Sequence, residues 1–155
     1  MPTATRGEAS IEIQASAERI YDVITDITSI GERSPECYRA EWLDGISEAQ
    51  VGARFVGYSR LGLLKWSTTS VVTAADRGNE FAFTVLAGDR ESTKWRYLID
   101  STGDGATLTE TYQFLWCPLY SRIAEIPIPR DRQLSRGIAR TIAHVKSRSE
   151  APIAP

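Results

Sequence analysis

The residues best suited to proton transfer lie in the last two strands that the sequence predicts. Glu110 shares its alternating face with Leu108, Tyr112 and Phe114, so its carboxylate is expected on the apolar side of the sheet. Burial there would disfavour the ionised form and raise the pKa of Glu110, which suits a general acid or base. Tyr97 and Tyr112 could donate hydrogen bonds to a substrate carbonyl or enolate oxygen. Glu110, Tyr112 and Tyr97 are therefore the candidate catalytic residues.

Each of these three residues also has a purely structural interpretation. The carboxylate could pair with an arginine, or a twist of the strand could bring it to solvent. The two tyrosines could be core aromatics whose hydroxyls bind the backbone. Both interpretations remain open at the level of sequence.

The predicted inner face of the sheet combines aromatic side chains with a few hydroxyl groups. A plain core would favour aliphatic residues, whereas a small-molecule pocket is mostly apolar with a few placed polar groups. Glu36 follows a proline in the loop at the expected mouth of this pocket, where it could contact a ligand or cap a turn. The candidate ligand-binding residues are Glu36, Trp42, Phe55, Trp66, Thr68, Phe83, Trp95, Phe114, Ile138 and Ile142.

Other chemistries find little support in the sequence. His144 is the single histidine, and Cys37 and Cys117 belong to no cluster with metal-ligand spacing. No serine or cysteine has an evident base partner, and no glycine-rich phosphate-binding motif is present. We expect His144 at the edge of a helix interface, and we expect no metal or redox cofactor.

Hydrophobic periodicity and turn residues predict the elements that position these side chains. Glu8–Gln14 reads as a strand, and a helix over Ala17–Ile27 follows with Ser16 as its N-cap. A short second helix is expected over Thr28–Arg33, ending before a proline. Six strands joined by hairpin-length turns come next and predict an antiparallel meander: Cys37–Leu43, Ala53–Arg60, Trp66–Ala75, Glu80–Leu86, Thr93–Ser101 and Ala106–Trp116.

A long C-terminal helix is predicted over Asp131–Arg148. Its apolar stripe consists of Leu134, Ile138, Ile142 and Val145, widened by Ala139 and Ala143. A preceding helical segment, 119–125, is expected to break at the prolines at positions 127 and 129. The order of elements is an α+β pattern, in which a curved antiparallel sheet of about seven strands wraps around the last helix.

Length and composition limit the classes of protein to consider. The 155 residues suit one domain, 1–155, with an ordered core over about 8–149. The net charge of −2 argues against nucleic acid or an anionic membrane as the main partner, and no stretch is long and apolar enough to span a membrane. The N-terminus lacks a signal-peptide core, so we expect a cytoplasmic protein. The sequence leaves open whether it is a monomer or a homodimer.

Several motifs resemble the SRPBCC superfamily, which includes START domains and Bet v 1-like proteins. The similarity is greatest to its polyketide cyclase/dehydratase branch and covers residues 11 to about 149. Many relatives carry a tryptophan where this chain has Arg33. The resemblance implies a helix-grip fold, and it rests on the segments 11–13, 15–21, 26–27, 31–37, 41–45, 51–55, 66–69 and 93–97.

The resemblance implies a protein that binds a hydrophobic, polyketide-like or aromatic small molecule in an internal cavity. As an enzyme it would assist cyclisation or dehydration by proton transfer. Two alternatives remain: a non-catalytic carrier or sensor of lipids and similar ligands, and a regulatory interaction protein with a filled interior. An unpaired polar group buried at the cavity floor would favour the enzyme, because a carrier does not require one.

Overall fold

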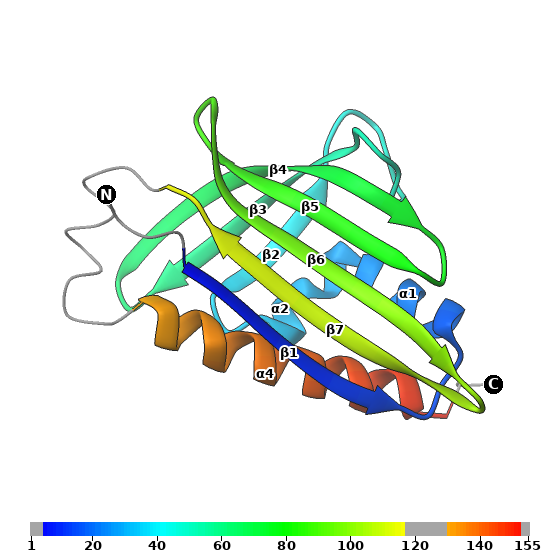
Figure 1. Cartoon of the computed structure of the whole chain (residues 1–155). Helices are drawn as coiled ribbons and strands as arrows, with labels where there is room; N and C mark the ends of the chain where they lie inside the picture. The colour runs from blue at the N-terminus through cyan, green and yellow to red at the C-terminus, as the bar shows by residue number, and fades with distance from the viewer. Residues whose placement is uncertain (1–4, 117–129, 153–155) are drawn as a thin grey trace.

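The computed structural model describes residues 5–116 and 130–152 of the chain (Figure 1). Strand β1 and the three short helical elements come first, six further strands follow, and a long helix ends the fold. In chain order the elements are β1 (Thr5–Ile13), α1 (Ala17–Thr25), the 3₁₀ helix η1 (Ile27–Ser29), α2 (Ile30–Arg33), β2 (Cys37–Trp42), β3 (Arg54–Leu61), β4 (Leu64–Asp76), β5 (Glu80–Ala87), β6 (Arg90–Thr102), β7 (Gly105–Phe114) and α4 (Arg130–Glu150).

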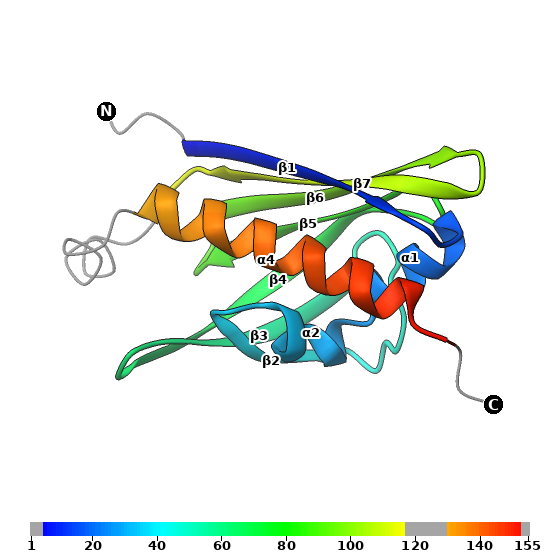
Figure 2. The same cartoon turned by 90° about the horizontal axis from the view of Figure 1, so that it is seen from below.

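The seven strands form one antiparallel sheet in the order β1-β7-β6-β5-β4-β3-β2. Strands β2 to β7 are a meander in which each strand pairs with its neighbour in sequence, and β1 joins the free edge of β7. The sheet is curved, and α4 lies along its open side (Figures 1 and 2). The predicted α+β helix-grip architecture is confirmed, including the number of strands.

Helix α4 supplies the apolar stripe that covers the sheet. It contacts β1, β7, α1 and α2, and Ile138, Ile142 and Val145 are almost fully buried. The side chain of Leu134 lies outside the described residues. The predicted helix over 119–125, and its break at the following prolines, also lie outside them.

The stripe is narrower than predicted. Ala139 and Ala143 are exposed, whereas Thr141 and Ser149 are buried. The error arose because both alanines lie one residue beyond stripe positions, which turns them by about 100° away from the sheet. The buried hydroxyl of Thr141 donates to the Gly137 carbonyl oxygen at 2.8 Å. A small residue whose hydroxyl donates to a carbonyl oxygen of its own helix can therefore be buried beside an apolar stripe.

The first helix begins as predicted and ends early. Ser16 Oγ accepts a hydrogen bond from the backbone N–H of Arg19, which confirms the N-cap. The helix stops at Thr25, because the chain tightens into η1 over residues predicted to be helical. The Arg19 guanidinium donates from Nε to the Ser149 carbonyl oxygen at 2.6 Å and so joins α1 to the end of α4. A cation at the C-terminal carbonyls of a helix is favourable.

The alternation of side chains fails at one position in β2. A bulge lies between Cys37 and Arg39, which pair with the adjacent residues Ser59 and Tyr58 of β3. Strict alternation along this strand would put Tyr38 on the inner face with Ala40. Tyr38 is instead the extra residue and is 42% exposed, whereas Ala40 is buried. A bulge reverses the facing of residues on either side of it.

A close contact fixes the edge strand β1 against β7. Gly7 pairs with Tyr112, and the Tyr112 ring lies where a Gly7 side chain would be. A Cβ atom at position 7 would be 2.3 Å from the Cε1 atom of Tyr112. Glycine is therefore required here for space.

We predict that Gly7→Ala lowers the free energy of unfolding by about 1–3 kcal/mol, because a buried ring must be displaced. Gly137→Ala is the matched control, since its Cβ would meet only Pro35 Cγ at 3.7 Å. Its helical position should raise stability by up to about 1 kcal/mol. Urea unfolding measures both, and equal effects at the two sites would contradict the packing described.

Candidate active site

Glu110 lies in the middle of β7, with Ala9 of β1 on one side and Tyr97 of β6 on the other. It is 2% exposed and shares the covered face with Leu108 and Tyr112. The structure therefore places this carboxyl group in the apolar interior, on the face that the alternation in sequence predicts. Its chemical role remains a prediction.

Tyr97 is the hydrogen-bond partner of this carboxyl group. Its hydroxyl donates to Glu110 Oε1 at 2.9 Å, and its ring stacks on Phe81 at an interplanar angle of 17°. Both residues of the pair are buried. The second carboxylate oxygen, Oε2, is buried without a hydrogen-bond partner among residues 5–116 and 130–152.

Arg33, at the end of α2, brings a positive charge to the same interior. Its guanidinium is buried and donates to carbonyl oxygens at the end of α1, to Ile24 at 2.9 Å and to Val23 at 3.2 Å. These carbonyls lack helical partners, so the arginine completes the end of the helix. We did not predict Arg33 as a site residue. The one available signal was that Arg33 departs from the tryptophan expected there from the family resemblance.

Burial dominates the electrostatics of this site. It raises the pKa of Glu110 to about 8, and the Tyr97 hydrogen bond and the Arg33 charge offset only part of that rise. Burial also raises the pKa of Tyr97 well above its ordinary value, with a further contribution from the negative charge of Glu110. At neutral pH the carboxyl group is therefore mostly protonated, and the phenol is fully so.

The predicted aromatic lining forms a continuous series of ring contacts. Trp42 meets Phe55 edge-on at 5.5 Å between centroids, and Phe55 meets Phe83 at 5.1 Å. Phe83 contacts Phe81 at 5.6 Å, which leads to Tyr97. The rings extend from the β2 edge of the sheet to Tyr97, the partner of the buried carboxyl group. A flat apolar ligand inserted between two of these rings would have aromatic surface on both sides.

Tyr112 has a different environment from Tyr97. Its hydroxyl lies 3.3 Å from Ser135 Oγ on α4, and its ring packs against Trp95 and Ile138. The structure thus joins Tyr97 directly to Glu110 and directs Tyr112 toward the helix. Of the other candidates, Ile142 lies in the main core, whereas Trp66, Thr68 and Phe114 are only partly buried.

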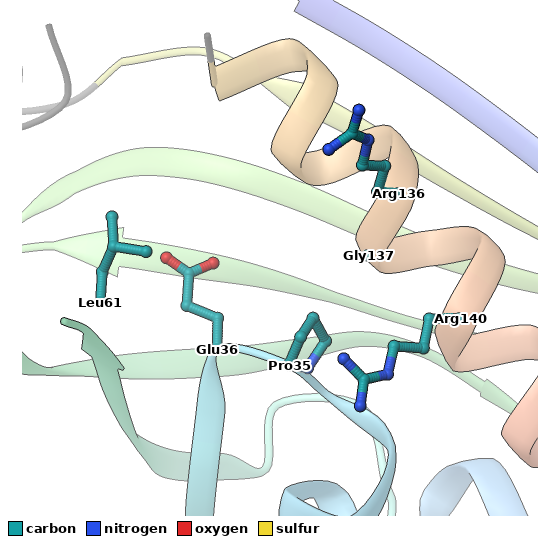
Figure 3. Close-up of a pocket in the computed structure, with 6 residues that line it drawn as sticks. All are labelled: Pro35, Glu36, Leu61, Arg136, Gly137 and Arg140. Atoms are coloured by element: carbon teal, nitrogen blue, oxygen red, sulfur yellow. The ribbon is translucent and has the colours of Figure 1, made fainter. Parts of the chain in front are cut away.

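Glu36 lines a groove between the α2–β2 loop and α4 (Figure 3). The groove has a volume of about 220 Å³, and Pro35 and Leu61 contribute apolar walls. Arg136 and Arg140 line it from the helix. None of the aromatic candidates lines this groove, so the position of Glu36 at the mouth of an aromatic cavity stays a prediction.

Other predicted features can be located in the structure. His144 is partly buried on α4, with Nε2 4.0 Å from Glu32 Oε2. No group of three or more histidine, cysteine or acidic residues that could hold a metal ion occurs in the described ranges. Within those ranges, no helix has the length and apolar character needed to cross a membrane.

The family model described as polyketide cyclase/dehydrase and lipid transport matches residues 4–128. This chain belongs to that family. A solution structure of a polyketide-cyclase-like protein from Corynebacterium glutamicum is 30% identical, with a TM-score of 0.63, and the match covers 94% of this chain and 91% of the other. Among curated proteins, none matches the sequence significantly.

More distant structures share the fold. A START superfamily protein from Mycobacterium smegmatis is 14% identical, with a TM-score of 0.69 over 96% of this chain and 98% of the other. The di-domain ARO/CYC protein StfQ, from the steffimycin biosynthetic pathway, is 13% identical with a TM-score of 0.73. That match covers 95% of this chain and 51% of StfQ, so this chain spans about half of the di-domain protein.

We predict that the stability of this family member depends on pH through Glu110. Because its folded-state pKa of about 8 exceeds the ordinary value of 4.5, the folded protein binds more protons than the unfolded chain between these values. The free energy of unfolding should therefore fall by roughly 1.4 kcal/mol for each unit by which the pH rises between these two values. Urea unfolding at several pH values measures this free energy in the wild type and in Glu110→Gln, and the difference between the two proteins should show the slope. A difference that does not change with pH would contradict the prediction.

A second prediction concerns the Tyr97 hydrogen bond. Tyr97→Phe removes a donor that stabilises the ionised carboxylate, so the pKa of Glu110 should rise further. Titration of the side-chain ¹³C carboxyl resonance measures this pKa. Tyr58→Phe, on partly exposed β3, is the control and should leave it unchanged. An unchanged pKa in Tyr97→Phe would mean that the bond does not form in solution.

Proposed function

We propose that this protein binds a hydrophobic, polyketide-like or aromatic small molecule between the inner face of the sheet and α4, and assists its cyclisation or dehydration. Glu110 is the general acid and base, and Tyr97 is the hydrogen-bond donor that holds it. The observation that carries the proposal is a buried carboxyl group, bonded to the Tyr97 hydroxyl, with its other oxygen unpartnered among the described residues. Burial raises its pKa to about 8. A buried carboxyl group with an unpartnered oxygen lowers stability, and groups with strongly raised pKa values cluster at functional sites.

Family membership supports a role with a small apolar ligand. The description of the family names polyketide cyclases, dehydrases and lipid transport. The structural relative StfQ is titled as an ARO/CYC protein of a biosynthetic pathway. The aromatic series that leads to Glu110 is consistent with a ligand built of fused or folded rings.

The chemistry needs one carboxyl group that can both accept and donate a proton. The ionised form of Glu110 removes a proton from the carbon next to a ligand carbonyl, which gives an enolate. In dehydration the same carboxyl group then protonates the hydroxyl on the next carbon, so that water leaves, a carbon–carbon double bond forms and Glu110 is again ionised. In cyclisation the enolate carbon attacks a second carbonyl, and Glu110 protonates the resulting alkoxide. A pKa near neutrality allows both steps.

A non-catalytic carrier is the second candidate, and one observation favours it. The groove at Pro35, Glu36 and α4 is lined by neither Glu110 nor Tyr97. A carrier needs only an apolar interior that opens to such a groove, and in that case the buried pair would serve to hold β6 against β7. This alternative requires no turnover.

The test is retention and turnover of ligand. The protein is purified natively, bound small molecules are extracted for mass spectrometry, and the retained compound is followed over time in wild type and Glu110→Gln. Glu8→Gln is the matched control, because Glu8 is exposed on the opposite face of the adjacent β1. The proposal predicts slow conversion by wild type and Glu8→Gln, and retention without conversion by Glu110→Gln, with turnover reduced at least about a hundredfold.

Each other outcome selects another function. Equal retention in all three proteins without conversion would mean a carrier. The absence of any retained compound, together with no uptake of hydrophobic dyes, would exclude both pocket functions and favour an interaction protein with a filled interior.

A further inference from the structure

We propose that the tip of the β3–β4 hairpin, residues 60–65, docks on the anionic surface of a phospholipid bilayer. This inference goes beyond the proposed function, because it requires neither a buried ligand nor proton transfer. It departs from our expectation, drawn from the net charge of −2, that an anionic membrane is not the main partner. Charges at physiological salt act over only about 8 Å, so the local charge at the tip decides rather than that of the whole chain.

The first observation is that the turn of this hairpin is apolar. The β3–β4 pair closes at Leu61 and Leu64, with Gly62 and Leu63 between them. Gly62 has a φ of 60°, the left-handed value that the first position of a type II′ turn requires. A polar residue such as asparagine or serine usually follows that glycine, whereas here Leu63 is fully exposed and Leu64 is 46% exposed. Since these leucines bury little surface within the chain, they indicate an apolar environment outside it.

The second observation is a pair of cations next to the turn. Arg60 and Lys65 lie directly opposite one another in the β3–β4 pair, and both are exposed. Two like charges at opposite positions destabilise a hairpin, and an anionic group between them removes the repulsion. Because side chains alternate along a strand, this cationic pair lies on one face of the hairpin and the pair of Leu61 and Leu64 on the other. The tip is therefore amphipathic.

Two further cations lie beside the apolar face of the tip. Arg136 and Arg140, one turn apart on α4, line the same groove as Leu61 (Figure 3). Neither these two arginines nor the two hairpin cations form an ion pair within residues 5–116 and 130–152. Glu36, the acid that lines the groove, is itself engaged within the chain. The leucines are thus accompanied by positive charge that the described residues leave unpaired.

The position of the tip suits a flat partner. Figure 2 shows the β3–β4 turn at the end of a projection that stands clear of α4 and of the other strands. An anionic bilayer offers acyl chains to the leucines and phosphates to the cations, whose long side chains reach the headgroups while their stems stay apolar. Docking in this way would place the groove beside the tip against the membrane.

The experiment measures how much of the protein sediments with lipid vesicles. One set contains phosphatidylcholine alone, and the other contains equal amounts of phosphatidylcholine and phosphatidylglycerol. The wild type should bind the anionic vesicles at least about tenfold more strongly than the neutral ones, because each cation near the surface adds attraction. Added salt should weaken this binding.

The apolar contribution is tested with Leu63→Asn, which places at the turn a residue that type II′ hairpins favour and so preserves the fold. Binding to the anionic vesicles should fall at least about tenfold, because one leucine side chain no longer leaves water. Val51→Asn is the matched control. Val51 is 69% exposed and precedes β3, at the end of that strand opposite to the tip, so this variant should bind as the wild type does.

The electrostatic contribution is tested with Lys65→Gln, which should lower binding to the anionic vesicles about fivefold and reduce its dependence on salt. Arg77→Gln makes the same change in net charge. It lies in the β4–β5 turn, at the end of β4 opposite to the tip, and should leave binding unchanged.

Three outcomes would overturn the inference. The first is equal binding by the wild type and Leu63→Asn, and the second is an equal loss in the tip variants and their controls. The third is the absence of wild-type binding to either kind of vesicle. Self-association of the wild type that Leu63→Asn abolishes would in that case show that a second copy of the chain covers the tip. All three are distinguishable from failure of the proposed function, because ligand retention and turnover are measured without vesicles.

Discussion

The structure depends on the covering of one face of a curved sheet by helices. The buried residues Ile138, Ile142 and Val145 lie on α4, which packs against β1 and β7, while α1 packs against β5 and β6, and η1 and α2 pack against β2. Arg19 of α1 donates to a carbonyl oxygen at the C-terminal end of α4. The edge strand β1 packs closely on β7, because Gly7 leaves room for the Tyr112 ring. Everything that lies between sheet and helix is thereby removed from water, including the groups that could do chemistry.

That removal gives Glu110, Tyr97 and Arg33 their properties. Glu110, Tyr97 and Arg33 would be ordinary surface groups on the outer face of the same sheet, with ordinary pKa values. In the interior, desolvation keeps the carboxyl group protonated to about pH 8, and the fixed positions of the tyrosine and the arginine decide how far the pKa rises. The fold thus turns one glutamate into a group that can exchange a proton near neutral pH, without a histidine.

Much of this arrangement could be predicted from sequence, because two regular periods carry the information. The two-residue period placed Glu110, Tyr97 and Phe83 on the covered face, and the helical period placed Ile138 and Ile142 opposite them. The periods misled in two places. In β2 a bulge interrupts the alternation and turns Tyr38 outward. On α4, Ala139 and Ala143 are apolar and adjacent to the stripe, but they are exposed.

The contribution of Arg33 could not be read from the chain, for a different reason. Its burial depends on carbonyl oxygens freed by the early end of α1 at Thr25, which the sequence did not reveal. Hydrogen bonds between a cation at the end of α2 and carbonyl oxygens at the end of α1 depend on how the two helices meet, and no spacing in the sequence encodes them. The same is true of the Tyr97–Glu110 hydrogen bond, whose residues were predicted to share a face but not to meet.

The central claim of this account is that Glu110 is a protonated carboxylic acid at neutral pH inside an apolar site. Infrared difference spectroscopy between wild type and Glu110→Gln tests it directly, because a protonated carboxyl group has a C=O stretching band that a carboxylate lacks. The account predicts this band at about pH 6 and its loss as the pH passes through about 8. A spectrum with no such band at about pH 6 would contradict the claim and, with it, the proposed acid–base role.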